Sequence, residues 1–192
     1  MFEKFHSKKF DNKETESINI NQQLTKSLSE NINTFKTIFQ NDNTIVFREI
    51  ENLNSGSFKT CIVYIEGMVN AEIIGKNIIS PIMNADLKRN KNENNILEEL
   101  KNKVISAKQI KNIKGIDELI QALFSGEVIL LKDDCDEALT IESKDWETRS
   151  ISQPDFEKVI SGPKEGFTES IVTNLSLLRR KLKTPDLKFK FK

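Results

Sequence analysis

The sequence predicts a mixed α/β or α+β fold, in which a small mixed sheet is flanked by helices. Segments with apolar residues at steps of three and four, as in amphipathic helices, alternate with apolar runs of strand length. The longest apolar runs, residues 61–65 and 128–131, are far shorter than the roughly 20 residues of a membrane-spanning helix. We therefore expect a soluble domain, and the sequence shows no internal repeat.

Composition argues against several classes of protein. The 192 residues include 29 basic and 29 acidic side chains, so no net positive field favours nucleic-acid binding. The two cysteines, Cys61 and Cys135, lack the spacing of a disulfide framework or of a metal-binding pair. A chain of this length can bury a core without such cross-links.

The chain divides into three parts by sequence pattern. Residues 1–17 have no periodic apolar pattern and no export signal, so we expect a flexible N-terminal lead-in. Residues 18–187 form the expected lobe, and residues 188–192 form a short basic tail.

The lobe should begin with a helix and a hairpin. Residues 18–40 carry one apolar stripe that predicts an amphipathic helix, and the polar residues 41–43 end it. The stripe consists of Leu24, Leu28, Ile32, Phe35 and Phe39. Residues 44–50 and 58–65 have the β-branched and aromatic content of two strands. The second strand is apolar on both faces and should be central.

The middle of the chain should add short helices and a strand. Residues 71–79 predict a short helix that Pro81 halts, because its ring and missing N–H oppose continuation. The polar residues 86–95 predict a surface loop. A helix over residues 96–105 and a weak strand over residues 108–113 follow.

A helix and a second hairpin come next. Asp117 can cap a helix that Gly126 closes. Strands over residues 127–131 and 138–141 should pair across the acidic turn at residues 133–136.

The C-terminal region contains the most unusual sequence pattern, two glycines and a proline within a turn at residues 162–167, directly before a helix predicted over residues 168–183. Upstream, Pro154 should begin a short helix through residue 160. Backbone N–H groups at such a turn could bind a phosphate or carboxylate. The alternative, which we prefer because no Walker pattern is present, is a structural turn with Phe167 in the core.

The last predicted helix carries an apolar stripe, and the region around it is rich in basic residues. Its apolar stripe, which should face the core, consists of Ile171, Leu175, Leu178 and Leu182. Residues 162–192 carry eight basic and three acidic side chains. Complementation of the helix dipole would explain this excess, and so would an acidic partner or a membrane surface.

The residues do not predict an enzyme or a cofactor site. The only histidine, His6, lies in the lead-in, so a His-dependent mechanism is disfavoured. Neighbouring aspartates should raise the pKa of the Cys135 thiol, so we interpret Cys135 as a turn residue rather than a nucleophile. The acidic turn lacks the glycine and the later glutamate of a calcium loop, so we expect no metal.

The stretch from residue 161 to 187 resembles the signature of the A subunits of GerA-type spore germinant receptors. The matching residues are Gly162, Pro163, Gly166, Phe167, Glu169, Thr173, Asn174, Arg179, Arg180, Pro185 and Leu187. Upstream, Arg149, Pro154 and Glu157 also fit the family pattern. Arg48 resembles an arginine in a strand of the family, and residues 64–69, which include Gly67, resemble the family's Tyr-Ile-Asp-Gly-Leu-Val turn. Asp134 stands where the family usually has a turn glycine.

The resemblance implies a non-catalytic sensor or signal-relay domain that takes part in nutrient-triggered germination. It implies a lobe similar to those of substrate-binding proteins, at the spore inner membrane, acting with B and C subunits and the rest of the A subunit. Residues 188–192 would then begin a connection to a second lobe. The ligand or lobe-interface candidates are Arg48, Gly67, Arg149, Glu157, Gly162, Pro163, Gly166, Phe167, Glu169, Asn174, Arg179 and Arg180.

Within this interpretation, Glu157 and Glu169 could pair with Arg149 or with an arginine of the last helix. Other functions stay open. The lobe alone could bind an amino acid, sugar or anion, or it could be a stand-alone protein-interaction domain. An enzyme that uses the glycine-rich turn for phosphate is the least favoured alternative.

Overall fold

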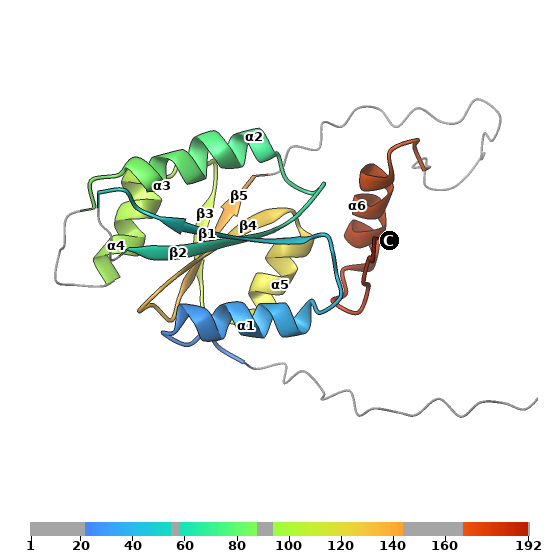
Figure 1. Cartoon of the computed structure of the whole chain (residues 1–192), viewed down its shortest axis with the longest axis horizontal. Helices are drawn as coiled ribbons and strands as arrows, with labels where there is room; N and C mark the ends of the chain where they lie inside the picture. Colours follow the sequence, from blue (N-terminus) through green and yellow to red (C-terminus); the bar gives the residue numbers. More distant parts are fainter. Residues whose placement is uncertain (1–21, 55–57, 88–93, 144–166, 192) are drawn as a thin grey trace, which may run out of the picture.

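A five-stranded antiparallel sheet forms the centre of the computed structural model, which describes residues 22–54, 58–87, 94–143 and 167–191 (Figure 1). The strand order is β1-β2-β4-β5-β3, and every neighbouring pair is antiparallel. The strands are β1 (Ile45–Glu51), β2 (Lys59–Ile65), β3 (Ile110–Ile113), β4 (Glu127–Lys132) and β5 (Ala138–Glu142). Both predicted hairpins, β1-β2 and β4-β5, are confirmed.

Helices cover both faces of the sheet (Figure 1). Helices α1 and α5 lie on one face, and the α2 to α4 segments lie on the other. The helical segments are α1 (Leu28–Ile38), α2 (Ala71–Ile74), α3 (Ser80–Asn84), α4 (Asn94–Glu99), α5 (Ile116–Phe124) and α6 (Ile171–Leu182). Two π-helical segments, η1 (Gly75–Ile79) and η2 (Leu100–Val104), continue α2 and α4.

Alternation along the central strands builds two apolar cores. Cys61 and Val63 of β2 face α1 and α5, whereas Ile62 between them faces the other helical layer. Ile129 and Leu130 of β4 divide in the same way. Because successive strand residues point to opposite faces, a strand buried on both faces must be apolar throughout. The predicted central position of β2 is confirmed.

Helix α1 begins later than the predicted helix. Ser27 is its N-cap, and the Ser27 hydroxyl accepts a hydrogen bond from the Glu30 N–H at 3.3 Å. Leu24 precedes this cap, is buried outside the helix, and donates its N–H to the Lys114 carbonyl at 3.0 Å. The spacing of Leu24 from the other apolar residues therefore correctly predicted that it is buried, but not that it is helical. Asn41, with φ of 66°, lies in the turn that ends α1.

The prediction that Pro81 halts a helix is wrong, because the helical path continues through Pro81 to Asn84. Proline leaves the carbonyl four residues earlier without its helical donor. That carbonyl belongs to Asn77, and it accepts the Ser106 N–H at 3.2 Å instead. The π-helical turn η1 changes the hydrogen-bond register just before the proline.

Helix α5 is capped by Gly115 and not by Asp117, which lies in the first turn, where an acid complements the helix dipole. Gly126 closes the helix with φ of 75°, as predicted. The predicted surface loop is shorter than expected, because α4 begins at Asn94. The lead-in at residues 1–17 and the helix at residues 154–160 lie outside the described residues.

Asp134 adopts a left-handed backbone conformation, with φ of 57°. It is exposed, so its side chain gains nothing from packing. A non-glycine residue in this region carries a steric cost.

Replacing Asp134 by glycine should therefore stabilise the chain, by up to about 1 kcal/mol. The matched control is Asp133→Gly, which should destabilise the chain because Asp133 Oδ1 accepts the Leu28 N–H at the start of α1 at 3.2 Å. Chemical denaturation measures both. An equal loss of stability in the two variants would contradict the role assigned to the Asp134 backbone.

Candidate functional site

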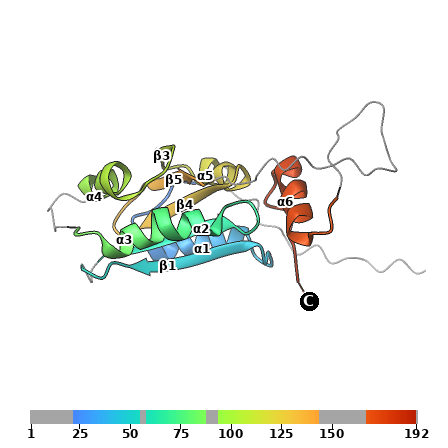
Figure 2. The same ribbon diagram turned by 90° about the horizontal axis from the view of Figure 1, so that it is seen from above.

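Helix α6 lies at one end of the sheet, beside the α1-β1 and β2-α2 connections (Figures 1 and 2). Ser170 is its N-cap and accepts the Thr173 N–H at 3.3 Å. The Asn174 side chain closes the preceding turn, because it accepts the Thr168 N–H and donates to the Thr168 carbonyl, each at 2.7 Å. These contacts fix where the helix starts.

The buried face of α6 differs from the predicted one. Ile171 and Leu182 are 68% and 56% exposed, and Leu175 and Leu178 are only half-buried, so the prediction that this stripe forms core is wrong. Phe167 is 69% exposed, so its predicted place in the core is also wrong. The buried residues of α6 are Ser176, Leu177 and Arg179, and neither apolar core includes a residue of α6.

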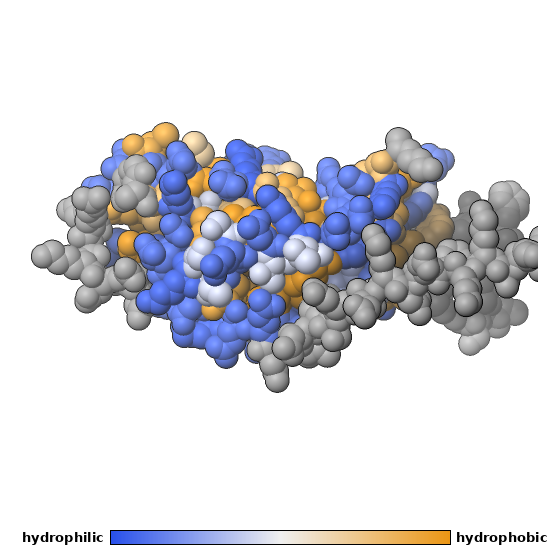
Figure 3. Space-filling model, turned by 60° about the horizontal axis from the view of Figure 1, so that its bottom comes forward, coloured by the Kyte–Doolittle hydropathy of each residue, from blue (hydrophilic) through white to orange (hydrophobic). Residues whose placement is uncertain are grey.

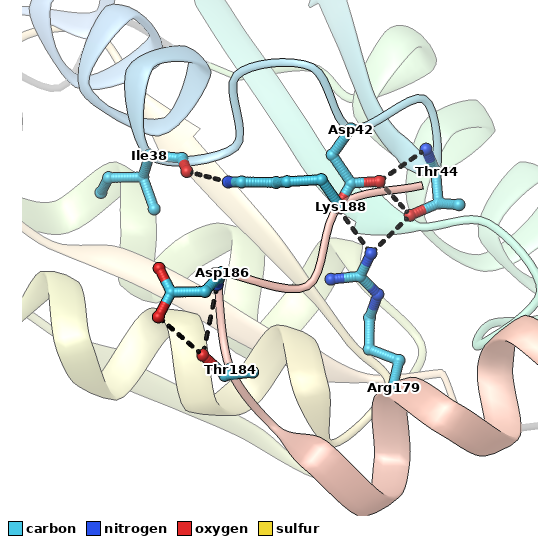
Figure 4. A network of polar contacts seen from close by, with 7 residues as sticks. All are labelled: Ile38, Asp42, Thr44, Arg179, Thr184, Asp186 and Lys188. Carbon is cyan, nitrogen blue, oxygen red and sulfur yellow. Dashed lines mark hydrogen bonds and ion pairs between the residues drawn. The ribbon is translucent and has the colours of Figure 1, made fainter. Parts of the chain in front are cut away.

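A buried ion pair joins α6 to the lobe (Figure 4). Arg179 Nη2 lies 2.5 Å from Asp42 Oδ2 and 3.2 Å from Thr44 Oγ1. The side chains of Arg179 and Asp42 are 1% and 0% exposed. Buried charges are tolerated when they are paired, and a guanidinium is suited to this because it cannot lose its proton.

The acceptor side of this pair is held in place by the lobe itself. Asp42 Oδ1 accepts the Thr44 N–H at 3.1 Å and the Thr44 hydroxyl at 2.8 Å. This local turn orients the carboxylate, so its second oxygen faces Arg179. Both hydrogen bonds to Oδ1 lie within residues 42–44 and involve no atom of α6.

Aromatic rings surround the Arg179 guanidinium. Its central carbon lies 4.8 Å from the ring centroid of Phe189 and 5.9 Å from that of Phe124. Rings at these distances stabilise a desolvated cation. Arg179 Nε and Nη1, however, are buried without a hydrogen-bond partner in the described part of the chain.

The C-terminal tail, residues 184–191, returns from α6 to the α1-β1 connection. The Asn43 N–H donates to the Phe189 carbonyl at 2.8 Å, and the Phe191 N–H donates to Asn43 Oδ1 at 3.2 Å. Lys188 Nζ donates to the carbonyl of Ile38 at the end of α1 (Figure 4). Partial burial lowers the pKa of Lys188 below its usual range.

Gly67 provides a second contact between the lobe and α6. It has φ of 78°, in the β2-α2 connection. A Cβ placed on Gly67 would overlap the Val172 side chain and lie 3.3 Å from the Val172 carbonyl oxygen. Only glycine satisfies both the conformation and the close approach.

The structure brings together some of the predicted site residues. Gly67 and Arg179 both lie in the interface between α6 and the lobe. Arg48, on the edge strand β1, and Glu169, just before α6, are exposed instead. Arg179 pairs with Asp42 rather than with Glu169. Arg180 is half-buried. The remaining candidates lie outside the described residues: Arg149, Glu157, Gly162, Pro163 and Gly166.

The sequence interpretation missed Asp42, Thr44 and Phe189. The Asp-x-Thr order of residues 42–44 is typical of a turn in which the carboxylate binds nearby backbone and hydroxyl groups, and this signal could have identified the acceptor. Nothing in the sequence links it to an arginine 137 positions away.

The two thiols are core residues rather than nucleophiles. Burial raises the pKa of Cys61 to about 11 and also raises the pKa of Cys135. Burial, not the nearby acids, is the larger cause for Cys135. Within the described ranges, no cluster of three or more His, Cys, Asp and Glu side chains could hold a metal ion.

Several large apolar side chains near α6 are exposed. They are Phe167, Ile171, Val172, Leu182 and Phe191, and Leu53 is exposed elsewhere. On the face shown in Figure 3, hydrophilic residues dominate and smaller apolar patches lie among them. Of the helices in the described part, none is long and apolar enough to cross a membrane.

Replacing Gly67 by alanine should destabilise the chain by about 1 to 2 kcal/mol from the backbone conformation alone. Overlap with Val172 should add to this loss, and Val172→Ala should restore part of it. Gly75→Ala is the control, because a Cβ on this helical glycine meets nothing within 4 Å and should stabilise slightly. The melting temperatures of the Gly67→Ala and Gly75→Ala chains measure the difference. Equal shifts in the two variants would contradict the contact between Gly67 and Val172.

Alanine substitutions at Asp42 and Arg179 should be strongly non-additive. Each single change leaves the opposite charge without its partner, so the double change should cost at least about 1 kcal/mol less than the sum. Urea denaturation of the four chains gives the coupling. Asp186→Ala combined with Arg179→Ala should be additive, since Asp186 bonds Thr184 within the tail. If the losses of unfolding free energy in Asp42→Ala and Arg179→Ala simply add in the double variant, the two side chains do not interact as an ion pair.

Comparisons with known proteins agree with this structure. The family model "GerA: Bacillus/Clostridium GerA spore germination protein" matches residues 33–192. The chain is 29% identical to "Spore germination protein KA" of Bacillus subtilis (strain 168) over 164 residues, which cover 85% of the chain and 30% of that protein. It is 30% identical to "Uncharacterized membrane protein YfkQ" of the same strain over 172 residues, which cover 88% of the chain and 32% of that protein. The chain thus spans about a third of the length of these relatives.

The fold also matches a solved structure. This is the crystal structure of the N-terminal domain of the A subunit of the Bacillus megaterium spore germinant receptor GerK3. The TM-score is 0.68 at 29% identity, and the match covers 88% of this chain and 59% of that chain. The chain therefore belongs to the GerA family of spore germination proteins, a family of non-enzymatic receptors, and has the fold of an A-subunit N-terminal domain.

Proposed function

We propose that this chain is a sensor or signal-relay domain of a spore germinant receptor, and that α6 carries the signal between the lobe and the rest of the receptor. In this proposal a small nutrient is the upstream signal. The other partners are the B and C subunits and the remainder of the A subunit at the spore inner membrane. Membership of the GerA family supports the setting.

The observation that carries the proposal is the buried pair between Arg179 and Asp42. Stability alone is a weak reason for such a pair, because an apolar contact of similar volume is often equally stable. A buried pair instead fixes geometry, since the arginine must meet the Asp42 carboxylate and the Thr44 hydroxyl at one place on the lobe. This supports a role in setting the position of α6 relative to the lobe.

The exposed apolar side chains of α6 support a further contact on its outer face. Ile171 and Leu182 end a stripe at helical spacing, and Leu175 and Leu178 in its middle are half-buried. Exposed apolar stripes of this kind commonly mark interaction surfaces. We assign this stripe, with Phe167 beside it, to a contact with another part of the receptor.

Spores that carry Arg179→Ala and Arg180→Ala in the receptor gene should germinate poorly in response to the cognate nutrient. The expected cause is loss of α6 positioning, with the lobe still folded. Colony formation and release of dipicolinate after nutrient exposure measure the response, and immunoblotting measures receptor level.

Lys190→Ala is the control, because Lys190 is an exposed basic residue of the tail. It should leave germination unchanged. Normal germination of the arginine variant at normal receptor level would reject the relay role of this helix.

A further inference from the structure

We propose that α6 and the C-terminal tail form a latch that docks on the α/β lobe and separates from it as one unit, with the Arg179–Asp42 pair setting the docking equilibrium. The proposal deepens the relay function proposed above and rests on it. It concerns the movement of residues 170–191 relative to an intact sheet.

The interface between α6 and the lobe meets the first core at Phe124, whose ring lies 5.9 Å from the Arg179 guanidinium. Neither core includes a residue of α6, and Leu177 is the only buried apolar side chain of α6. Undocking therefore uncovers Leu177 and one side of Phe124 and leaves the contacts between the sheet and its helices in place, whereas separating β2 from β4 would open both cores. Segments with few buried apolar contacts open without global unfolding.

The ion pair suits reversible docking. Asp42 stays in its turn with Thr44 whether or not α6 is present, because both hydrogen bonds to Asp42 Oδ1 lie within the lobe. When α6 separates, both charges return to water, and their hydration offsets the lost attraction. The unpartnered Nε and Nη1 of Arg179 also regain hydrogen bonds there.

The helix and the tail should move together. The Phe189 ring lies over the Arg179 guanidinium, so the cation and the ring leave the site as one group. The two hydrogen bonds to Asn43 hold the tail at the same place on the lobe. When Arg179 leaves Asp42, the tail loses the packing of the Phe189 ring against the lobe-bound guanidinium.

Residues with left-handed backbone lie on both sides of this contact. Lys183, which caps α6 where the tail begins, has φ of 44°, and Asn41 beside Asp42 has φ of 66°. Asparagine tolerates this conformation, whereas at a helix C-terminus it usually belongs to glycine, so Lys183 carries the steric cost.

Amide hydrogen exchange of the 192-residue chain tests the latch. Amides in the second half of α6 should exchange at least about 100-fold faster than those of Ile62 and Leu130 in the central strands. Asp42→Asn should accelerate exchange in α6 by about 10-fold or more and change the sheet amides less than about twofold. Asp186→Asn, the control in the tail, should change neither.

A second variant keeps the test decisive if Asp42→Asn disturbs folding. Phe189→Ala removes the ring that lies 4.8 Å from the Arg179 guanidinium and leaves every residue of the lobe unchanged. It should accelerate exchange in α6 and leave the rates of the sheet amides unchanged, and equal acceleration of both would contradict the latch.

Equal protection of α6 and the sheet in the unmodified chain would overturn the latch, as would equal acceleration of both by Asp42→Asn. Either result would leave the relay function standing, because that function is decided by germination of the arginine variant. Loss of the relay function with a confirmed latch would instead show that α6 moves without carrying the signal.

Discussion

The position of α6 depends on one requirement, that the buried guanidinium of Arg179 must meet a carboxylate. Asp42 provides it from the α1-β1 connection, where Thr44 holds the carboxylate in a fixed orientation. A charge in a buried site tolerates few alternatives, so this pair, together with the close approach of Val172 to Gly67, limits the place and rotation of the helix. The apolar stripe of α6 is turned away from the core as a consequence.

The rest of the lobe is arranged so that this contact can form. The two helical layers bury both faces of β2 and β4, and neither apolar core includes a residue of α6. The connections at one end of the sheet contact α6. Asp42 in the α1-β1 connection pairs with Arg179, and Gly67 in the β2-α2 connection leaves room for Val172. The apolar cores of the sheet and the polar contact with α6 thus involve largely different residues, which suits the relay proposed above.

Local patterns predicted those elements whose burial follows from local periodicity. The continuous apolar runs of β2 and β4 identified central strands, and the turns between the paired strands identified both hairpins. The path through Pro81 was not predictable, because it depends on the Ser106 N–H, a donor from a distant segment. The buried face of α6 was mispredicted for a related reason. Amphipathic spacing assigns apolar residues to the core, and only the tertiary structure shows that Arg179 is buried instead.

The most direct test compares germination of spores carrying Asp42→Asn, Arg179→Ala, or both, at matched receptor levels. Asp42 and Arg179 lie on separate elements and meet in a buried ion pair, so the double variant shows whether their defects share one cause. We expect the two single variants to be impaired to a similar degree and the double variant to be no worse than either. Normal germination of the Asp42→Asn spores alongside impaired Arg179→Ala spores would contradict the claim that this pair couples α6 to the lobe.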